Sequence, residues 1–127
     1  MRITRAHWDE LVAHAREEAP LECCGVVRLR DGVVEDVTRG YNERQSPTGY
    51  QLDSKTQLLA YQAEDDGLTA GTYHSHPRSS AQPSQTDINL ASYSDYLYLI
   101  VSLEAEPEIR AWWIDDGKVS EEEVEIT

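Results

Sequence analysis

The segment His74–Asp87 reads HSHPRSSAQPSQTD, and its spacing is the most informative in the chain. The residues at 70–75 are predicted to form a strand that leads into the two histidines. Residues i and i+2 of a strand point to the same face, so His74 and His76 can present both imidazoles to one ion. Asp87 falls one turn into the helix predicted next, and the intervening loop can bring it back to the histidines. Two histidines and one aspartate leave a fourth tetrahedral position open, which is typical of a catalytic zinc site.

Each half of this pattern also has an ordinary structural interpretation. A His-x-His pair can belong to a turn, and Ser84-x-x-Asp87 is a capping box for the start of a helix. The cap and the ligand are compatible, because the helix start can fix Asp87 while its carboxylate reaches outward. From spacing alone, both interpretations stay open.

A hydrolytic site also needs a group that takes a proton and returns it. Glu22 lies two residues after Pro20 and directly before the apolar run 23–27. An acid at the edge of a buried strand is unusual. Glu22 is therefore a candidate base, with a strand-end acid in solvent as the alternative.

The rest of the chain predicts one α/β domain over residues 1–127 with a mixed sheet flanked by helices. Helices are expected at about 5–18, 54–66 and 84–92, and strands at about 22–30, 33–38, 70–75, 96–103, 108–114 and 118–126. Asp31-Gly32 and Asp116-Gly117 predict hairpin turns. Thr4 is expected to cap the first helix, and Ser54 with Gln57 to form a capping box for the second.

The composition restricts the possible partners. The net charge is −13, with 24 acidic against 11 basic residues. Such a surface repels phosphate backbones, so we expect no nucleic acid partner. The charge is either an ordinary solvated surface or an adaptation to high salt. No apolar run is long enough for a membrane span, and the N-terminus has no signal core, so a cytoplasmic location is expected.

Four further residues could carry chemistry and are interpreted as structural. Cys23 and Cys24 are adjacent, so a disulfide between them would be strained, and we expect reduced, buried side chains. His7 and His14 lie on the first predicted helix without an acidic partner. We interpret them as surface or half-buried residues and not as ligands.

The combined pattern resembles the JAMM motif of the MPN+ metallopeptidases. The matching segments are Pro20-x-Glu22-x-Cys24-Gly25, His74-Ser75-His76-Pro77 and Ser84-x-x-Asp87, in the order and spacing of that motif. The resemblance covers nearly the whole chain and implies a cytidine-deaminase-like α/β fold. It implies that His74, His76 and Asp87 bind zinc, that Glu22 is the general base and acid, and that Ser84 stabilises the oxyanion. Ser75 and Pro77 would shape the turn.

The resemblance also implies a protein substrate, either a ubiquitin-like or a sulfur-carrier protein with a C-terminal Gly-Gly. The bond would join that tail to a lysine or to a newly made cysteine. The segment Asn42–Asp53 resembles the sulfur-carrier–cysteine peptidases and favours the cysteine, with an archaeal desampylase-type role as the alternative. The loop Tyr41–Gly49 is the expected wall of the substrate groove.

Two rival functions are distinguished by sequence features. A non-catalytic scaffold of this fold would have a broken ligand set, and this chain has every ligand. A zinc deaminase expects His-x-Glu with Pro-Cys-x-x-Cys, and neither occurs. No feature of the sequence predicts the oligomeric state.

Overall fold

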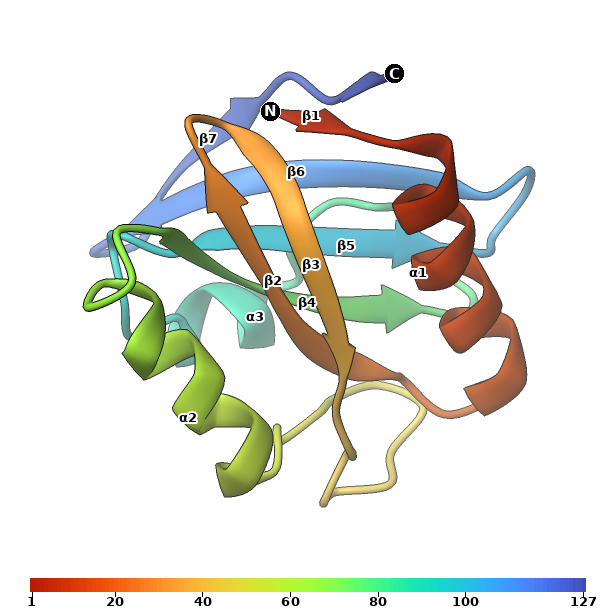
Figure 1. Ribbon diagram of the computed structural model, residues 1–127. Helices are drawn as coiled ribbons and strands as arrows, with labels where there is room; N and C mark the ends of the chain where they lie inside the picture. The colour runs from red at the N-terminus through yellow and green to blue at the C-terminus, as the bar shows by residue number, and fades with distance from the viewer.

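An eight-stranded mixed sheet forms the centre of the structure, a computed structural model that describes all 127 residues (Figure 1). The strands are β1 (Arg2–Ile3), β2 (Cys24–Arg30), β3 (Val33–Arg39), β4 (Thr69–His76), β5 (Leu97–Ser102), β6 (Glu108–Asp115), β7 (Lys118–Glu122) and β8 (Glu125–Ile126). The helices are α1 (Arg5–Glu18), α2 (Ser54–Ala63) and α3 (Gln85–Leu90). The sheet order is β7-β6-β5-β4-β2-β3-β1-β8, with β4 parallel to β5 and antiparallel to β2. The predicted α/β fold class is confirmed.

The sheet separates two hydrophobic clusters, one on each face. In the first, Leu11 and Ala15 of α1 pack against alternate residues of the central strands, and Tyr73 of β4 belongs to this cluster. In the second, Ala60 of α2 packs with residues of the opposite parity, including Ile100 of β5. Figure 1 shows α1 apart from α2 and α3, which lie together near the other face. The even-numbered residues at the end of β4 therefore point toward α2 and α3.

Local signals were the most accurate part of the sequence-based expectation. Asp31, Gly32, Asp116 and Gly117 all have positive φ, as two-residue hairpins require, and both hairpins form as predicted. The Thr4 side chain accepts a hydrogen bond from the His7 backbone N–H at 3.2 Å and caps α1.

None of the three helices combines the length and the apolar character that a membrane span requires.

The expected capping of α2 and the expected last strand were wrong in detail. Asp53, not Ser54, caps α2, because its carboxylate accepts from both the backbone and the hydroxyl of Thr56 at 3.1 and 3.0 Å. The helix also ends at Ala63, three residues before its predicted end at residue 66. The last strand divides into β7 and β8, because β8 leaves β6 and pairs in parallel with β1 at the far edge of the sheet.

His14 is fully buried, whereas the sequence suggested a surface or half-buried side chain. Its Nδ1 lies 2.7 Å from the Tyr73 hydroxyl across the interface between α1 and the sheet. This hydrogen bond offsets the cost of burying the ring, and burial lowers the pKa of His14. His7 is half-buried, as expected. Both cysteines are free and buried, which confirms their interpretation, and burial raises the pKa of Cys23 to about 11.

Candidate metal centre

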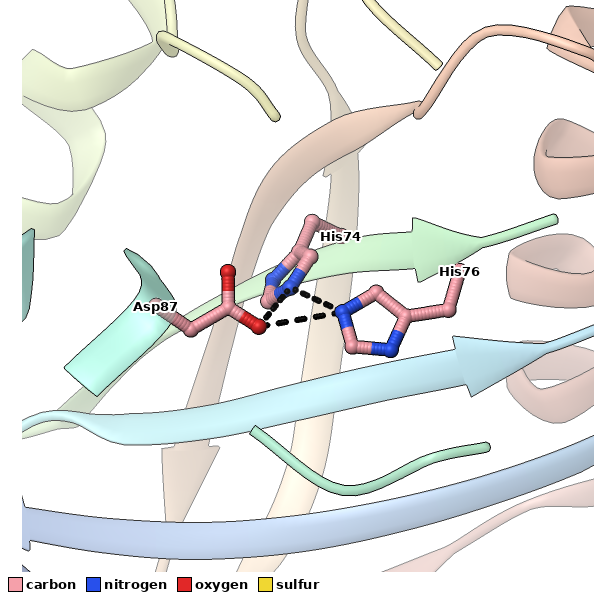
Figure 2. Close-up of side chains that lie close together, drawn as sticks. All are labelled: His74, His76 and Asp87. Carbon is pink, nitrogen blue, oxygen red and sulfur yellow. Dashed lines mark hydrogen bonds and ion pairs between the residues drawn. The ribbon is translucent and has the colours of Figure 1, made fainter. Parts of the chain in front are cut away.

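Three side chains from two elements converge at the end of β4 (Figure 2). The Nε2 atoms of His74 and His76 lie 3.2 Å apart, and Asp87 Oδ2 lies 3.1 Å from the first and 3.0 Å from the second. Strand alternation places both imidazoles on one face, while α3 carries the carboxylate. These residues form the one group of His, Cys, Asp and Glu side chains in the structure that could hold a metal ion. The expected convergence of His74, His76 and Asp87 is therefore present.

The separation of these three atoms fits a small tetrahedral ion. Zinc binds imidazole nitrogen and carboxylate oxygen at about 2.0–2.2 Å, so two ligand atoms at a tetrahedral angle lie roughly 3.3–3.5 Å apart. The observed separations of 3.0 to 3.2 Å are only slightly shorter. A set of two imidazoles and one carboxylate is also the chemistry of three-ligand catalytic zinc sites. The residues present fit zinc.

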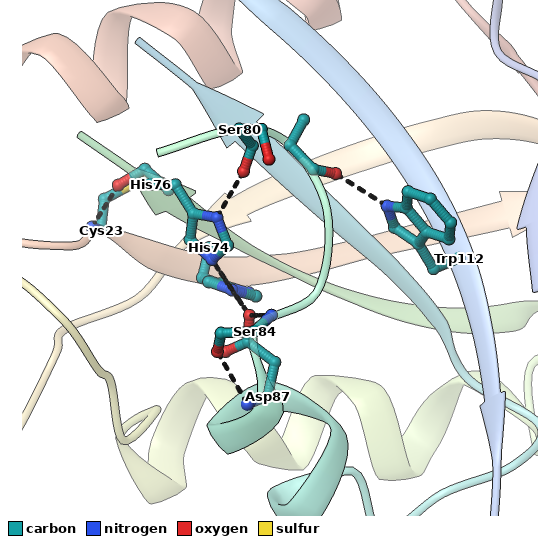
Figure 3. A network of polar contacts seen from close by, with 9 residues as sticks. Cys23, His74, His76, Ser80, Ser84, Asp87 and Trp112 are labelled. Carbon is teal, nitrogen blue, oxygen red and sulfur yellow. Dashed lines mark hydrogen bonds and ion pairs between the residues drawn. The ribbon is translucent and has the colours of Figure 1, made fainter. Parts of the chain in front are cut away.

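Neighbouring groups hold the two imidazole rings in place. His76 Nδ1 donates to the Ser80 carbonyl at 2.7 Å, which leaves the Nε2 lone pair directed at the cluster (Figure 3). A second hydrogen bond of this kind, from the remote ring nitrogen, orients metal-binding histidines and fixes their tautomer. The Tyr50 ring stacks on His74 with centroids 4.5 Å apart. The ligand atoms are thus oriented before any ion binds.

The pKa shifts of His74 and Asp87 favour a bound cation, and that of His76 does not. Burial lowers the pKa of His74 against the opposing influence of Asp87, so this ring is neutral and can donate its lone pair. Burial alone would raise the pKa of Asp87, but its contacts with the two histidines and the Ser84 backbone N–H hold it well below its usual range. Burial acts to lower the pKa of His76 too, but its contacts with Asp87 and Ser80 outweigh this and raise it.

Ser84 and Asp87 form the capping box that the sequence allowed. Asp87 N–H donates to Ser84 Oγ at 3.0 Å, and Ser84 N–H donates to Asp87 Oδ2 at 3.0 Å (Figure 3). The same Oδ2 faces both imidazoles, so the cap and the ligand interpretations hold together. Because the Ser84 oxygen accepts one hydrogen bond here, its own O–H is free to donate to a bound molecule.

Glu22 is buried, and not the solvent-exposed acid of the alternative interpretation. It lies two residues before β2, and only 4% of it is exposed. Its Oε1 has no hydrogen-bond partner within the protein. Burial raises the pKa of Glu22 to about 7, against the smaller opposing effect of His76. A carboxyl group with a pKa near neutrality can both accept and return a proton.

Glu22, His76 and Ser84 line the same cleft, which has a volume of about 550 Å³. Pro47 and Thr48 complete it from the loop that was expected to form the groove wall. The first part of that loop lines a smaller cavity of about 160 Å³, which also reaches Glu22. The structure therefore brings all five predicted site residues to one place, and confines the predicted wall to the end of the loop.

Asn42 is a site residue whose structural role the sequence did not show. It is 8% exposed, and its Nδ2 donates to the carbonyls of Glu22 and Gly49, each at 3.0 Å. Its Oδ1 accepts from the backbone N–H groups of Arg44 and Gln51, each at 3.0 Å. One side chain thus joins the candidate base to the wall of the cleft. An asparagine inside a polar loop gives little local signal of such contacts.

Ser75 supports the same segment from β4. Its buried Oγ accepts from the Cys23 backbone N–H at 2.8 Å. The expectation that Ser75 shapes the turn was therefore wrong, because its side chain points to the face opposite the histidines and fixes the residue after Glu22.

We expect Asn42→Asp to lower the free energy of unfolding by about 2 kcal/mol, because a carboxylate cannot donate to the two buried carbonyls that Nδ2 now satisfies. Turnover should fall as well, since Glu22 loses an anchor, while the metal content stays unchanged. Denaturant unfolding and metal analysis measure these effects, with the exposed neighbour substitution Glu43→Gln as the control. An Asn42→Asp protein as stable as the wild type would contradict the assigned role.

The sequence of the chain is similar to those of several known proteins. Residues 4–115 match the family described as prokaryotic homologs of the JAB domain. The chain is 40% identical to the CysO-cysteine peptidase of Mycobacterium tuberculosis, a match that covers 93% of this chain and 85% of that protein. It is 36% identical to the desampylase of Haloferax volcanii, over 85% of this chain and 84% of that protein. A probable TtuB-protein conjugate cleaving protease from Thermus thermophilus is 34% identical, over 91% of this chain and 77% of that protein.

Solved structures share the fold of this chain. The solution structure of a protein from Desulfitobacterium hafniense superposes with a TM-score of 0.86 at 35% identity and covers 99% of this chain and 92% of its own. A JAB1/MPN domain protein from Archaeoglobus fulgidus superposes with a TM-score of 0.65 at 20% identity, over 99% of this chain and 98% of that one. At that identity the second likeness bears on the fold alone.

Proposed function

The chain belongs to the prokaryotic JAB domain family, and from this premise we propose that it is a zinc-dependent peptidase. Its substrate would be a ubiquitin-like or sulfur-carrier protein, cut at the amide bond after the C-terminal Gly-Gly. The observation that carries the proposal is the convergence of His74, His76 and Asp87 beside the buried carboxyl group of Glu22. The three relatives are named as a peptidase, a desampylase and a probable protease, which supports an enzyme over a non-catalytic scaffold.

In this proposal the three converging residues hold the ion and Glu22 moves the proton. A zinc ion bound there supplies Lewis-acid chemistry, since it acidifies water and polarises a carbonyl. The Glu22 carboxylate accepts a proton from the attacking water at its unpartnered Oε1. It then returns that proton to the leaving amine, a transfer that suits a pKa of about 7. Asn42 and Ser75 keep the segment of Glu22 fixed during both transfers.

Ser84 is the proposed oxyanion donor. Its hydroxyl oxygen accepts from Asp87 N–H, so the O–H direction is free and its position is fixed by the start of α3. A donor held in advance toward developing negative charge stabilises the transition state more than the ground state. We expect such a donor in any acyl transfer that this cleft performs.

The names of the relatives support the substrate class. One relative is named for a CysO-cysteine bond, and another for a TtuB-protein conjugate. A Gly-Gly tail fits a cleft whose walls include Pro47 and Thr48, because glycine has no side chain to clash. The similarity to the CysO-cysteine peptidase favours the cysteine-bearing carrier, and a desampylase-like role on lysine conjugates is the alternative. Two free cysteines agree with the proposed cytoplasmic location, where thiols stay reduced.

The proposal is tested with a ubiquitin-fold protein whose Gly-Gly tail carries either one added cysteine or a lysine-linked protein. We expect cleavage directly after the second glycine in both, with the cysteine-extended form preferred. Mass spectrometry should show the Gly-Gly terminus restored. Cleavage of an unrelated unfolded peptide at a similar rate, with no action on either Gly-Gly adduct, would contradict the proposed substrate and leave the metal site unaffected.

A further inference from the structure

The cleft contains one permanently cationic side chain, that of Arg78. It lies two residues after His76 and lines the cleft together with Glu22 and Ser84. Arg78 makes no ion pair, whereas Arg28, Arg30, Arg39 and Arg110 all pair with carboxylates. Five of the nine arginines, Arg78 among them, make no ion pair, and Arg78 is the one of these five that lines the cleft. The proposed reaction does not use Arg78.

The backbone around Arg78 is held from three sides although it belongs to a polar loop. Ser102 Oγ donates to the Ser79 carbonyl at 2.6 Å, and His76 Nδ1 donates to the Ser80 carbonyl at 2.7 Å. Trp112 Nε1 donates to the Ala81 carbonyl at 2.9 Å (Figure 3). Loop carbonyls anchored by three side chains of the strands give Arg78 a fixed point of attachment, while its guanidinium stays exposed.

We propose that Arg78 forms a carboxylate subsite, which binds the free α-carboxylate of a single amino acid attached after the Gly-Gly tail. The planar guanidinium donates two parallel hydrogen bonds to a carboxylate and is the residue best suited to this recognition. The inference rests on the proposed function and adds a basis for choosing between its two substrate types. A carrier extended by one residue ends in a carboxylate, whereas a lysine conjugate offers an uncharged side chain at the same place.

The covalent distances agree with this assignment. In a one-residue extension, the carboxylate carbon lies within roughly 4 Å of the scissile carbonyl carbon, because only the N and Cα atoms separate them. The Cα atoms of His76 and Arg78 are at most roughly 7 Å apart, and a guanidinium on a flexible stem can span such a gap. In a lysine conjugate the backbone carbonyl lies beyond the whole aliphatic side chain and carries no charge. Arg78 thus distinguishes the two leaving groups by charge and position.

Three substrates built on one ubiquitin-fold protein test the inference. The first carries a C-terminal cysteine with a free carboxylate, the second the same cysteine as its amide, and the third a lysine-linked peptide. We expect zinc-loaded wild type to cleave the acid with a kcat/KM about tenfold above that for the amide, mostly through a lower KM. In Arg78→Gln this ratio should fall to near one, and in Arg78→Glu below one.

Arg44→Gln is the matched control. Arg44 is also exposed and makes no ion pair, but it does not line the cleft. Arg44→Gln removes the same charge as Arg78→Gln, but outside the cleft. The ratio of kcat/KM for acid to that for amide should therefore stay at the wild-type value in Arg44→Gln. An equal kcat/KM for acid and amide in the wild type, or an unchanged ratio in Arg78→Gln, would overturn the carboxylate subsite alone. Failure of the zinc-loaded wild type to cleave any of the three substrates would overturn the proposed function, and the subsite with it.

Discussion

Glu22→Gln will retain zinc and the fold but lose turnover by about 10²–10⁴-fold, the usual contribution of a general acid–base group. The amide has nearly the same shape as the carboxyl group, so it fills the buried position without taking or returning a proton. His74, His76 and Asp87 form a complete set of ligand atoms without Glu22, so metal content should stay at the wild-type level. Single-turnover kinetics and metal analysis on the same preparation measure both quantities.

The stability of this variant offers a second, independent readout. Glu22 is buried with an unpartnered Oε1, and burial is the main cause of its raised pKa. Neutralising such a group removes a desolvation cost, so Glu22→Gln should melt at or above the wild-type temperature. The sign also follows from the pKa. Since the folded pKa of about 7 exceeds the usual value of 4.5 for glutamate, the wild type binds the proton more tightly when folded, and it loses this stability as pH rises from about 4.5 to about 7. Glu22→Gln should lack that loss.

Glu18→Gln is the control for this experiment, because Glu18 is an exposed acid at the end of α1. It should keep wild-type turnover and wild-type stability. A folded, zinc-loaded Glu22→Gln protein with near wild-type turnover would show that the proton carrier lies elsewhere.

The sequence predicted those features that depend on regular local geometry. Strand alternation alone put His74 and His76 on one face, and two Asp-Gly pairs located both hairpins. The Ser84-x-x-Asp87 capping box predicted where Asp87 lies at the start of a helix, and the same carboxylate faces the two histidines. These signals depend on residues close together in the chain.

The features that could not be predicted depend on contacts across the sheet. His14 contacts Tyr73 from a different element, and Asn42 bonds three backbone groups of its own loop and one of the distant Glu22 segment. Gly25, part of the quoted motif, has a reason visible only in the fold, since a Cβ there would lie 2.3 Å from the Tyr73 ring. The pairing of β1 with β8 joins two-residue strands from opposite ends of the chain, which have no periodicity to detect.

The purified protein will contain about one zinc per chain, and His74→Ala, His76→Ala and Asp87→Ala will each lose it together with all measurable turnover. Each variant removes one of three ligand atoms that lie within 4.8 Å of one another. Two protein ligands rarely retain zinc, so the effect should be near complete, not graded. Adding a chelator to the wild type should reproduce the loss of turnover, and adding zinc back should restore it.

Asp87 needs a separate control, because the same carboxylate caps α3. Ser84→Ala breaks the capping box from its other side and should cost about 1 kcal/mol of stability, as loss of an N-cap does. It leaves the three ligand atoms in place, so zinc should remain bound while turnover falls through loss of the oxyanion donor. Loss of zinc in Asp87→Ala but not in Ser84→Ala would show that the Asp87 carboxylate binds the metal and does not act only as a helix cap. Equal zinc content in wild type and His76→Ala would instead contradict the proposed metal site, whatever the effect of Ser84→Ala on the cap of α3.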